Sequence, residues 1–112
     1  MIDDRLPPSL LEALARQGNS RTFRAQTILL NEGDEGNSLY IVIEGRLRAY
    51  ASSPEGRDVV LSEHGPGEYV GELSLDGGTR SASVKTLAAS TCCVVAGSQM
   101  QAFMAEHPDF AL

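Results

Sequence analysis

Between Gly33 and Gly78, glycines recur at short intervals along the chain. The glycines separate short runs of β-forming residues and stand at positions 33, 36, 45, 56, 65, 67, 71, 77 and 78. Turn residues at this spacing are typical of a sandwich, barrel or jelly roll made of short antiparallel strands. The sequence therefore predicts a mainly β fold.

Seven runs are predicted to be strands, and they cover residues 22–24, 27–30, 39–44, 46–52, 58–63, 82–86 and 91–95. In residues 46–52, arginines alternate with small and apolar residues, as in a strand with one buried face. The run Leu39–Ile43 is apolar on both faces, so we expect it to be the most buried strand.

Short helices are predicted at both ends of this β region. Residues 7–18 begin with prolines, carry leucines three and four apart, and end at a glycine, which indicates a short amphipathic helix. Ser98 and Gln101 have the spacing of a capping box, so we expect a second helix to start at Ser98. Its apolar stripe would contain Met100, Phe103 and Met104, and Pro108 would end it or open the next element.

Length and charge restrict the classes of partner. A chain of 112 residues fits one domain. Its net charge of -6 has the wrong sign for holding a nucleic-acid backbone, so we expect no direct nucleic-acid binding by this domain. Asp3 and Asp4 occupy the place of a basic signal region, and the chain has no apolar run long enough to span a membrane. A cytoplasmic location is the resulting expectation.

The two cysteines, Cys92 and Cys93, are adjacent. A bridge between neighbours would be strained, and neighbours on a strand point to opposite faces. We therefore expect both thiols to be reduced, with one in the core and one near the surface.

The stretch from Tyr69 to Val84 has features that suit a phosphate ligand. Gly71 would let the backbone approach a ligand, and the amides of a short helical turn after it would point at an anion. Arg80 supplies a planar fork of donors, and Ser81 adds a hydroxyl. The Glu72 carboxylate would repel a phosphate but could accept a hydrogen bond from a sugar hydroxyl. Together these residue types indicate a nucleotide.

The segment Gly71-Glu72-Leu73-Ser74-Leu75, followed after a loop by Arg80-Ser81-Ala82-Ser83-Val84, resembles the phosphate-binding cassette of the cyclic nucleotide-binding domain family. The resemblance runs from about Leu6 to Leu112. It implies an antiparallel β jelly roll (double-stranded β-helix) with short N-terminal and C-terminal α-helices. It also implies that a cyclic phosphate is held by Arg80, Ser81 and the amides after Gly71, with Glu72 on the ribose 2′-OH. The implied ligand-binding set is Gly71, Glu72, Leu73, Ser74, Arg80, Ser81 and Ala82.

Ser81 stands where family members that favour cGMP commonly have threonine, so the resemblance favours cAMP over cGMP as the ligand. The chain stops at what resembles the first turn of a further helix. We therefore expect residues 1–112 to be a regulatory module of a longer protein that passes binding to a following helix or output domain, or to a second copy in a homodimer.

Two other functions stay open. The chain could be a jelly-roll interaction or dimerisation domain without ligand, or the sensor half of a transcription regulator. Enzyme chemistry is not expected, because His64 and His107 lie in different segments without a neighbouring histidine at ligand spacing, and no nucleophile arrangement is evident. We expect no metal and no cofactor, His64 in a turn and His107 at a helix end. Arg46, Arg48 and Arg57 are interpreted as part of a solvated face.

Overall fold

The computed structural model describes residues 8–72 and 79–108. Two helices flank eight strands. In chain order the elements are α1 (Pro8–Gln17), β1 (Asn19–Phe23), β2 (Ile28–Leu30), β3 (Ser38–Glu44), β4 (Leu47–Ser52), β5 (Asp58–His64), β6 (Tyr69–Glu72), β7 (Ser83–Thr86), β8 (Ser90–Ala96) and α2 (Gly97–Glu106). No helix in this described part is long and apolar enough to cross a lipid bilayer.

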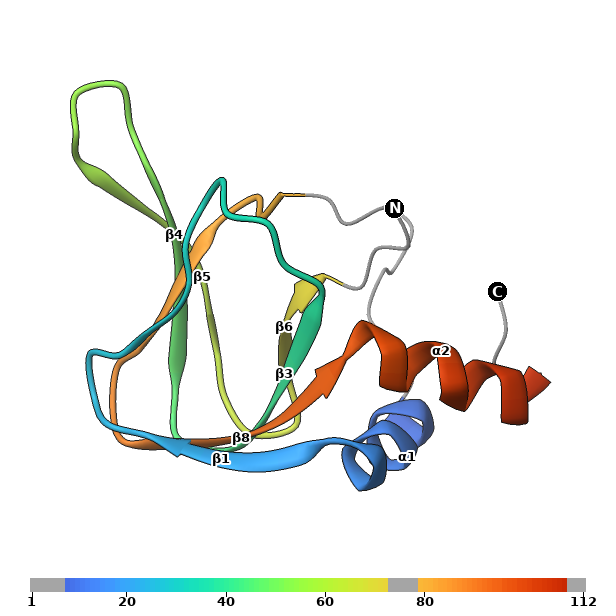
Figure 1. The fold of residues 1–112 in the computed structure, drawn as a ribbon. Coiled ribbons are helices and arrows are strands. Elements are labelled where there is room, and N and C mark those ends of the chain that lie inside the picture. Colours follow the sequence, from blue (N-terminus) through green and yellow to red (C-terminus); the bar gives the residue numbers. More distant parts are fainter. Residues whose placement is uncertain (1–7, 73–78, 109–112) are drawn as a thin grey trace.

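The strands form two antiparallel sheets of four strands each. One sheet has the order β1-β8-β3-β6 and is called the helix-side sheet, because α1 and α2 pack on it; the other has the order β2-β7-β4-β5 and is called the hairpin sheet. Figure 1 shows the two sheets facing each other, with both helices beyond the helix-side sheet. This topology is that of a jelly roll: consecutive strands alternate between the two sheets, except that β4 and β5 pair as a hairpin within one sheet. The predicted fold class is confirmed.

The helix-side sheet separates two hydrophobic clusters. Leu14 of α1 and Phe103 of α2 pack with Cys93 and Val95 on its helix side. A second cluster fills the space between the sheets and consists of Leu30, Val42, Leu47, Ala49, Val70, Val84 and Cys92. Strand β8 of this sheet is thus buried on both faces, whereas four of the five residues of the edge strand β1 are exposed.

Both cysteines are consequently buried. Cys92 is 0% exposed and Cys93 is 2% exposed, and both are free thiols. The expectation that one thiol lies near the surface was wrong, because the helices cover the face of β8 that would otherwise meet solvent. Burial, with a further contribution from Cys93, raises the pKa of the Cys92 thiol to about 11.

β8 also replaces β3 as the most buried strand. Four of its seven residues are buried, whereas β3 ends in two exposed positions. The pairing of β3 with β8 shifts between Val42 and Glu44. This bulge interrupts the alternation of the strand, and 51% of the Ile43 surface is exposed. The prediction for Leu39–Ile43 was therefore wrong at Ile43.

The start of α2 differs from the capping-box prediction. Ala96 is the N-cap residue, and Gln99 Oε1 accepts a hydrogen bond of 2.8 Å from its backbone N–H. Gly97 N donates to Asn37 O at 2.9 Å, and a Cβ on Gly97 would overlap the Asn37 side chain. The helix therefore begins at Gly97, one residue before Ser98. The contact of Gly97 with Asn37, just before β3, fixes this start in place of the capping box predicted at Ser98.

Candidate functional site

Among the described residues, Arg80 is the one charged side chain that is buried, with 6% of its surface exposed. Its backbone is fixed at both polar atoms: Arg80 N donates to Asp34 O at 2.7 Å, and Gly33 N donates to Arg80 O at 2.9 Å. Its Nη2 donates to Ser38 Oγ at 3.1 Å. Burial of a guanidinium is costly unless polar groups surround it, so this position is one where an anion would be stabilised.

Two glycines make room for this side chain. A Cβ on Gly36 would stand 2.6 Å from Arg80 Nε, and a Cβ on Gly71 would stand 3.5 Å from Nη1. The guanidinium therefore lies between the segment that precedes β3 and strand β6. Gly36 lies 44 residues before Arg80 in the sequence, whereas Gly71 lies nine residues before it.

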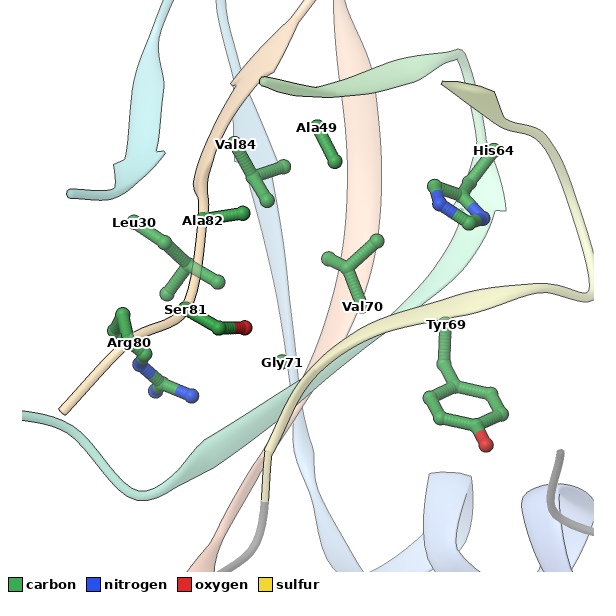
Figure 2. A pocket seen from close by; sticks show the side chains of 10 residues that line it. All are labelled: Leu30, Ala49, His64, Tyr69, Val70, Gly71, Arg80, Ser81, Ala82 and Val84. Carbon is green, nitrogen blue, oxygen red and sulfur yellow. The ribbon is translucent and has the colours of Figure 1, made fainter. Parts of the chain in front are cut away.

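A pocket of about 160 Å³ opens beside the guanidinium. Figure 2 shows Arg80 and Ser81 on one side of it, with the Ser81 hydroxyl directed inward, and His64 on the opposite side with its ring directed inward. The walls between them are apolar and come from Leu30, Ala49, Val70, Ala82 and Val84. The Tyr69 side chain turns away and packs against the helix-side cluster. This pocket can hold an anionic group at one end and a flat apolar ring along its walls.

Gly71 serves the neighbouring strand as well as the pocket. It pairs with Leu39 in the sheet, has a φ of +103°, and a Cβ there would stand 2.5 Å from Ser38 O. β6 was not predicted, and the helical turn expected to begin at Glu72 was wrong there, because Glu72 pairs with Ser38 as a strand residue. Leu73, Ser74 and the side chain of Glu72 lie outside the described residues.

The described members of the expected binding set meet at one place. Gly71, Arg80, Ser81 and Ala82 all line the pocket. The sequence did not point to Ser38 or His64. Ser38 lies 42 residues before Arg80, and the backbone hydrogen bonds of Arg80 to Gly33 and Asp34 bring the two segments together.

His64 is the last residue of β5 rather than a turn residue. Its Nε2 lies 2.8 Å from Ser62 Oγ, and its Nδ1 lies 3.4 Å from Glu68 Oε1. Gly65 N donates to Glu68 Oε2 at 2.9 Å. This bond, with a smaller contribution from His64, holds the pKa of Glu68 below its ordinary value. The ring is therefore held through both nitrogens.

The pattern of strands, glycines and Arg80 matches a known family. A family model described as "Cyclic nucleotide-binding domain" matches residues 20–107. The chain belongs to this family.

Relatives of this cyclic nucleotide-binding domain occur in proteins of different kinds. A CRP-like cAMP-activated global transcriptional regulator of Mycobacterium tuberculosis is 30% identical over 105 residues, which cover 93% of this chain and 47% of the regulator. The crystal structure of the Thermus thermophilus catabolite activator protein is 28% identical with a TM-score of 0.82, over 95% of this chain and 50% of that one. A lysophospholipase of Neosartorya fischeri is 32% identical over 89 residues, 79% of this chain and 6% of the enzyme.

The chain thus spans about half the length of the two regulators. The fold and the family that the resemblance implied are confirmed, and the same kind of domain is found in regulators and in a far longer enzyme.

The arginines interpreted as a solvated face behave as one in this cyclic nucleotide-binding domain. Arg46 Nε lies 2.9 Å from Glu63 Oε1, and Arg48 Nη2 lies 2.8 Å from Glu63 Oε2. These contacts, Arg48 first, lower the pKa of Glu63. Arg57 is exposed. Within residues 8–72 and 79–108, no three His, Cys, Asp or Glu side chains are grouped so that they could hold a metal ion.

Proposed function

We propose that this domain binds a cyclic nucleotide, cAMP in preference to cGMP, in the pocket beside Arg80. The observation that carries the proposal is the buried guanidinium at the polar end of an otherwise apolar pocket. A cyclic nucleotide has one negative charge and one flat ring system, and both parts match this arrangement. A single small anion is also compatible with the net charge of -6, because its binding is local.

The residues of the cassette have separate roles in this proposal. Arg80 donates to two phosphate oxygens through its planar fork, and the Ser81 hydroxyl donates to the same group. The backbone amides of Leu73 and Ser74, after Gly71, contact the phosphate, and Glu72 accepts the ribose 2′-OH. Ala82 contributes apolar surface beside the phosphate. These roles follow the resemblance of this segment to the cassette of the family.

Two observations support cAMP over cGMP. Ser81 replaces the threonine that is common in cGMP-preferring members. The relative from Mycobacterium tuberculosis is described as cAMP-activated. The preference therefore rests on this one position and on likeness to one regulator.

The domain would act as a cytoplasmic regulatory module that is not itself an enzyme. The segment that packs on Arg80 also holds α2, because Asn37 O accepts the N–H of Gly97 while Ser38 Oγ accepts from Arg80. Nucleotide binding would shift the population of α2 arrangements and so reach a following helix, an attached output domain such as a DNA-binding domain, or a second copy of the chain. The nucleotide can shift this equilibrium only by the difference between its affinities for the two arrangements of α2.

Calorimetry and thermal unfolding with cAMP, cGMP and 5′-AMP test the proposal. Cyclic nucleotide at a hundred times its Kd should stabilise the chain by about 2.7 kcal/mol. Arg80→Ala should weaken cAMP binding roughly tenfold to more than a hundredfold, because each charge-assisted bond contributes about 1.5 to 3 kcal/mol. Arg57→Ala removes an exposed arginine and serves as the matched control. Absence of binding by any cyclic nucleotide would leave the ligand-free interaction domain as the function.

A further inference from the structure

We infer that His64 faces the base of the bound nucleotide and makes the affinity for the nucleotide depend on pH. This inference rests on the proposed function and adds a specificity-determining residue outside the phosphate-binding cassette. It starts from the position of the imidazole, which enters the pocket from the side opposite Arg80.

The pocket has one direction along which a nucleotide fits. A phosphate beside Arg80 places the remainder of the ligand along the apolar walls formed by Ala49, Val70 and Val84. His64 lies at the far side of these walls in Figure 2. A base that extends away from the guanidinium therefore meets the imidazole ring.

The contacts of the ring allow its charge to change while its orientation stays the same. In the neutral tautomer with the proton on Nδ1, this N–H faces Glu68 Oε1 at 3.4 Å and Nε2 accepts a hydrogen bond from the Ser62 hydroxyl at 2.8 Å; in the protonated state, both N–H groups face the same two partners. Because both nitrogens are occupied in either state, the ring offers its face and its C–H edge to the ligand. Protonation thus adds a positive charge at a fixed place.

The surrounding charges set the sign of the effect. Among the described residues these are Glu68 in the turn before β6, Glu63 on the same strand, and Arg46 just before β4. Arg46 is paired with Glu63, whereas Glu68 is kept ionised by the Gly65 N–H. A neutral His64 adds no charge beside the base. A protonated His64 compensates the charge of Glu68, which lies 3.4 Å from its Nδ1, and attracts the π system of the base. Affinity should therefore rise as the pH falls.

The test measures the Kd of the 112-residue chain for cAMP by calorimetry between about pH 5.5 and about pH 8.5, the range that brackets the ordinary titration of histidine. The Kd of the parent should increase about fivefold from the low to the high end, the size expected for one cation–π contact. His64→Gln keeps a polar side chain without the charge, and its Kd should stay near the high-pH value of the parent throughout. His107→Gln, at the end of α2, is the matched control and should keep the full pH dependence.

Proton NMR gives a second measurement that does not depend on affinity. The chain has two histidines, so the His64→Gln spectrum assigns both imidazole C–H resonances. Addition of cAMP should shift the resonances of His64 and leave those of His107 in place. Proper folding of each variant is checked by its cooperative thermal unfolding.

The outcomes separate this inference from the proposed function. If the parent binds cAMP through Arg80, and His64→Gln has the same pH profile as the parent, the role of His64 is overturned while nucleotide binding stands. If the folded parent binds no cyclic nucleotide at any pH, both are overturned. A pH dependence that His64→Gln removes and His107→Gln retains supports the inference.

Discussion

The α carbon of Gly36 lies against the guanidinium of Arg80, so closely that a Cβ on Gly36 would stand 2.6 Å from Nε and 2.8 Å from Nη2. Ordinary contacts between such atoms are near 3.5 Å. Gly36 precedes β3, and Arg80 precedes β7. The place of the buried cation is thus set by a residue that has no polar side chain.

We therefore expect Gly36→Ala to displace the guanidinium and to weaken cAMP binding by at least about fivefold, since the loss of one well-placed charge-assisted bond is enough for this. Calorimetry provides the Kd. In the Arg80→Ala variant, adding Gly36→Ala should cause no further loss of cAMP affinity, because the two substitutions act on the same contact. Additive losses in the double variant would mean that Gly36 affects binding in another way.

Gly71→Ala should destabilise the fold more than Gly33→Ala does. Both glycines have a positive φ, +103° and +87°, but a Cβ on Gly33 meets no atom within 4 Å, whereas a Cβ on Gly71 would stand 2.5 Å from Ser38 O. Gly33→Ala should cost about 1 to 2 kcal/mol for its backbone conformation alone. Gly71→Ala should exceed this value in urea unfolding. Equal losses would contradict the close contact with β3.

Glu63 should make the stability depend on pH. Arg48 and then Arg46 lower the pKa of this carboxyl in the folded chain. Its contribution to stability is therefore present above the unfolded pKa and is lost as the pH falls through the folded value. Glu63→Gln should lower the urea midpoint at about pH 7, and the difference from the parent should narrow toward about pH 3.

The pair partners of Glu63 are partly exposed, so the effect should also shrink at high salt. Glu55→Gln, an exposed residue in the turn between β4 and β5, controls for the loss of one negative charge. A midpoint difference that stays constant on acidification would rule out the ion pairs as its source.

The two thiols should resist modification in the native chain. Both are buried, and with a pKa of about 11 for Cys92, roughly one thiol in a thousand is ionised at about pH 8. Burial also raises the pKa of Cys93. An aromatic disulfide reagent should label both cysteines rapidly in urea and far more slowly without it. Native labelling at the rate of the unfolded chain would show that the helices do not cover Cys93.

Local patterns in the sequence were sufficient for most elements, because alternation and turn residues are properties of short segments. They failed where a distant segment decides the conformation. Tyr69–Glu72 contains a glycine and is only four residues long, and it is a strand because β3 supplies its hydrogen bonds. Ser98 matched the spacing of a capping box, but the hydrogen bond from Gly97 N–H to Asn37 O fixes the start of the helix before Ser98. The burial of both cysteines likewise depends on helices at the two ends of the chain.

In the candidate site, too, some residues could be predicted from the sequence and others could not. Arg80 and Ser81 are adjacent and carry recognisable donor chemistry, so the sequence indicated them. Ser38 and Gly36 contact the guanidinium across more than 40 residues. His64 reaches the pocket only because β5 ends beside it. Such contacts arise from the pairing of strands and have no signature within a short segment.

The peptide unit that joins Asn37 to Ser38 connects the cation of the pocket with the last helix. Ser38 Oγ accepts from Arg80, and Asn37 O accepts the N–H of Gly97, the first residue of α2. Two neighbouring residues thus anchor two distant parts of the molecule. A movement of residues 37–38 changes the hydrogen bond to Arg80 and the hydrogen bond to Gly97 together, so the pocket is coupled to the start of α2.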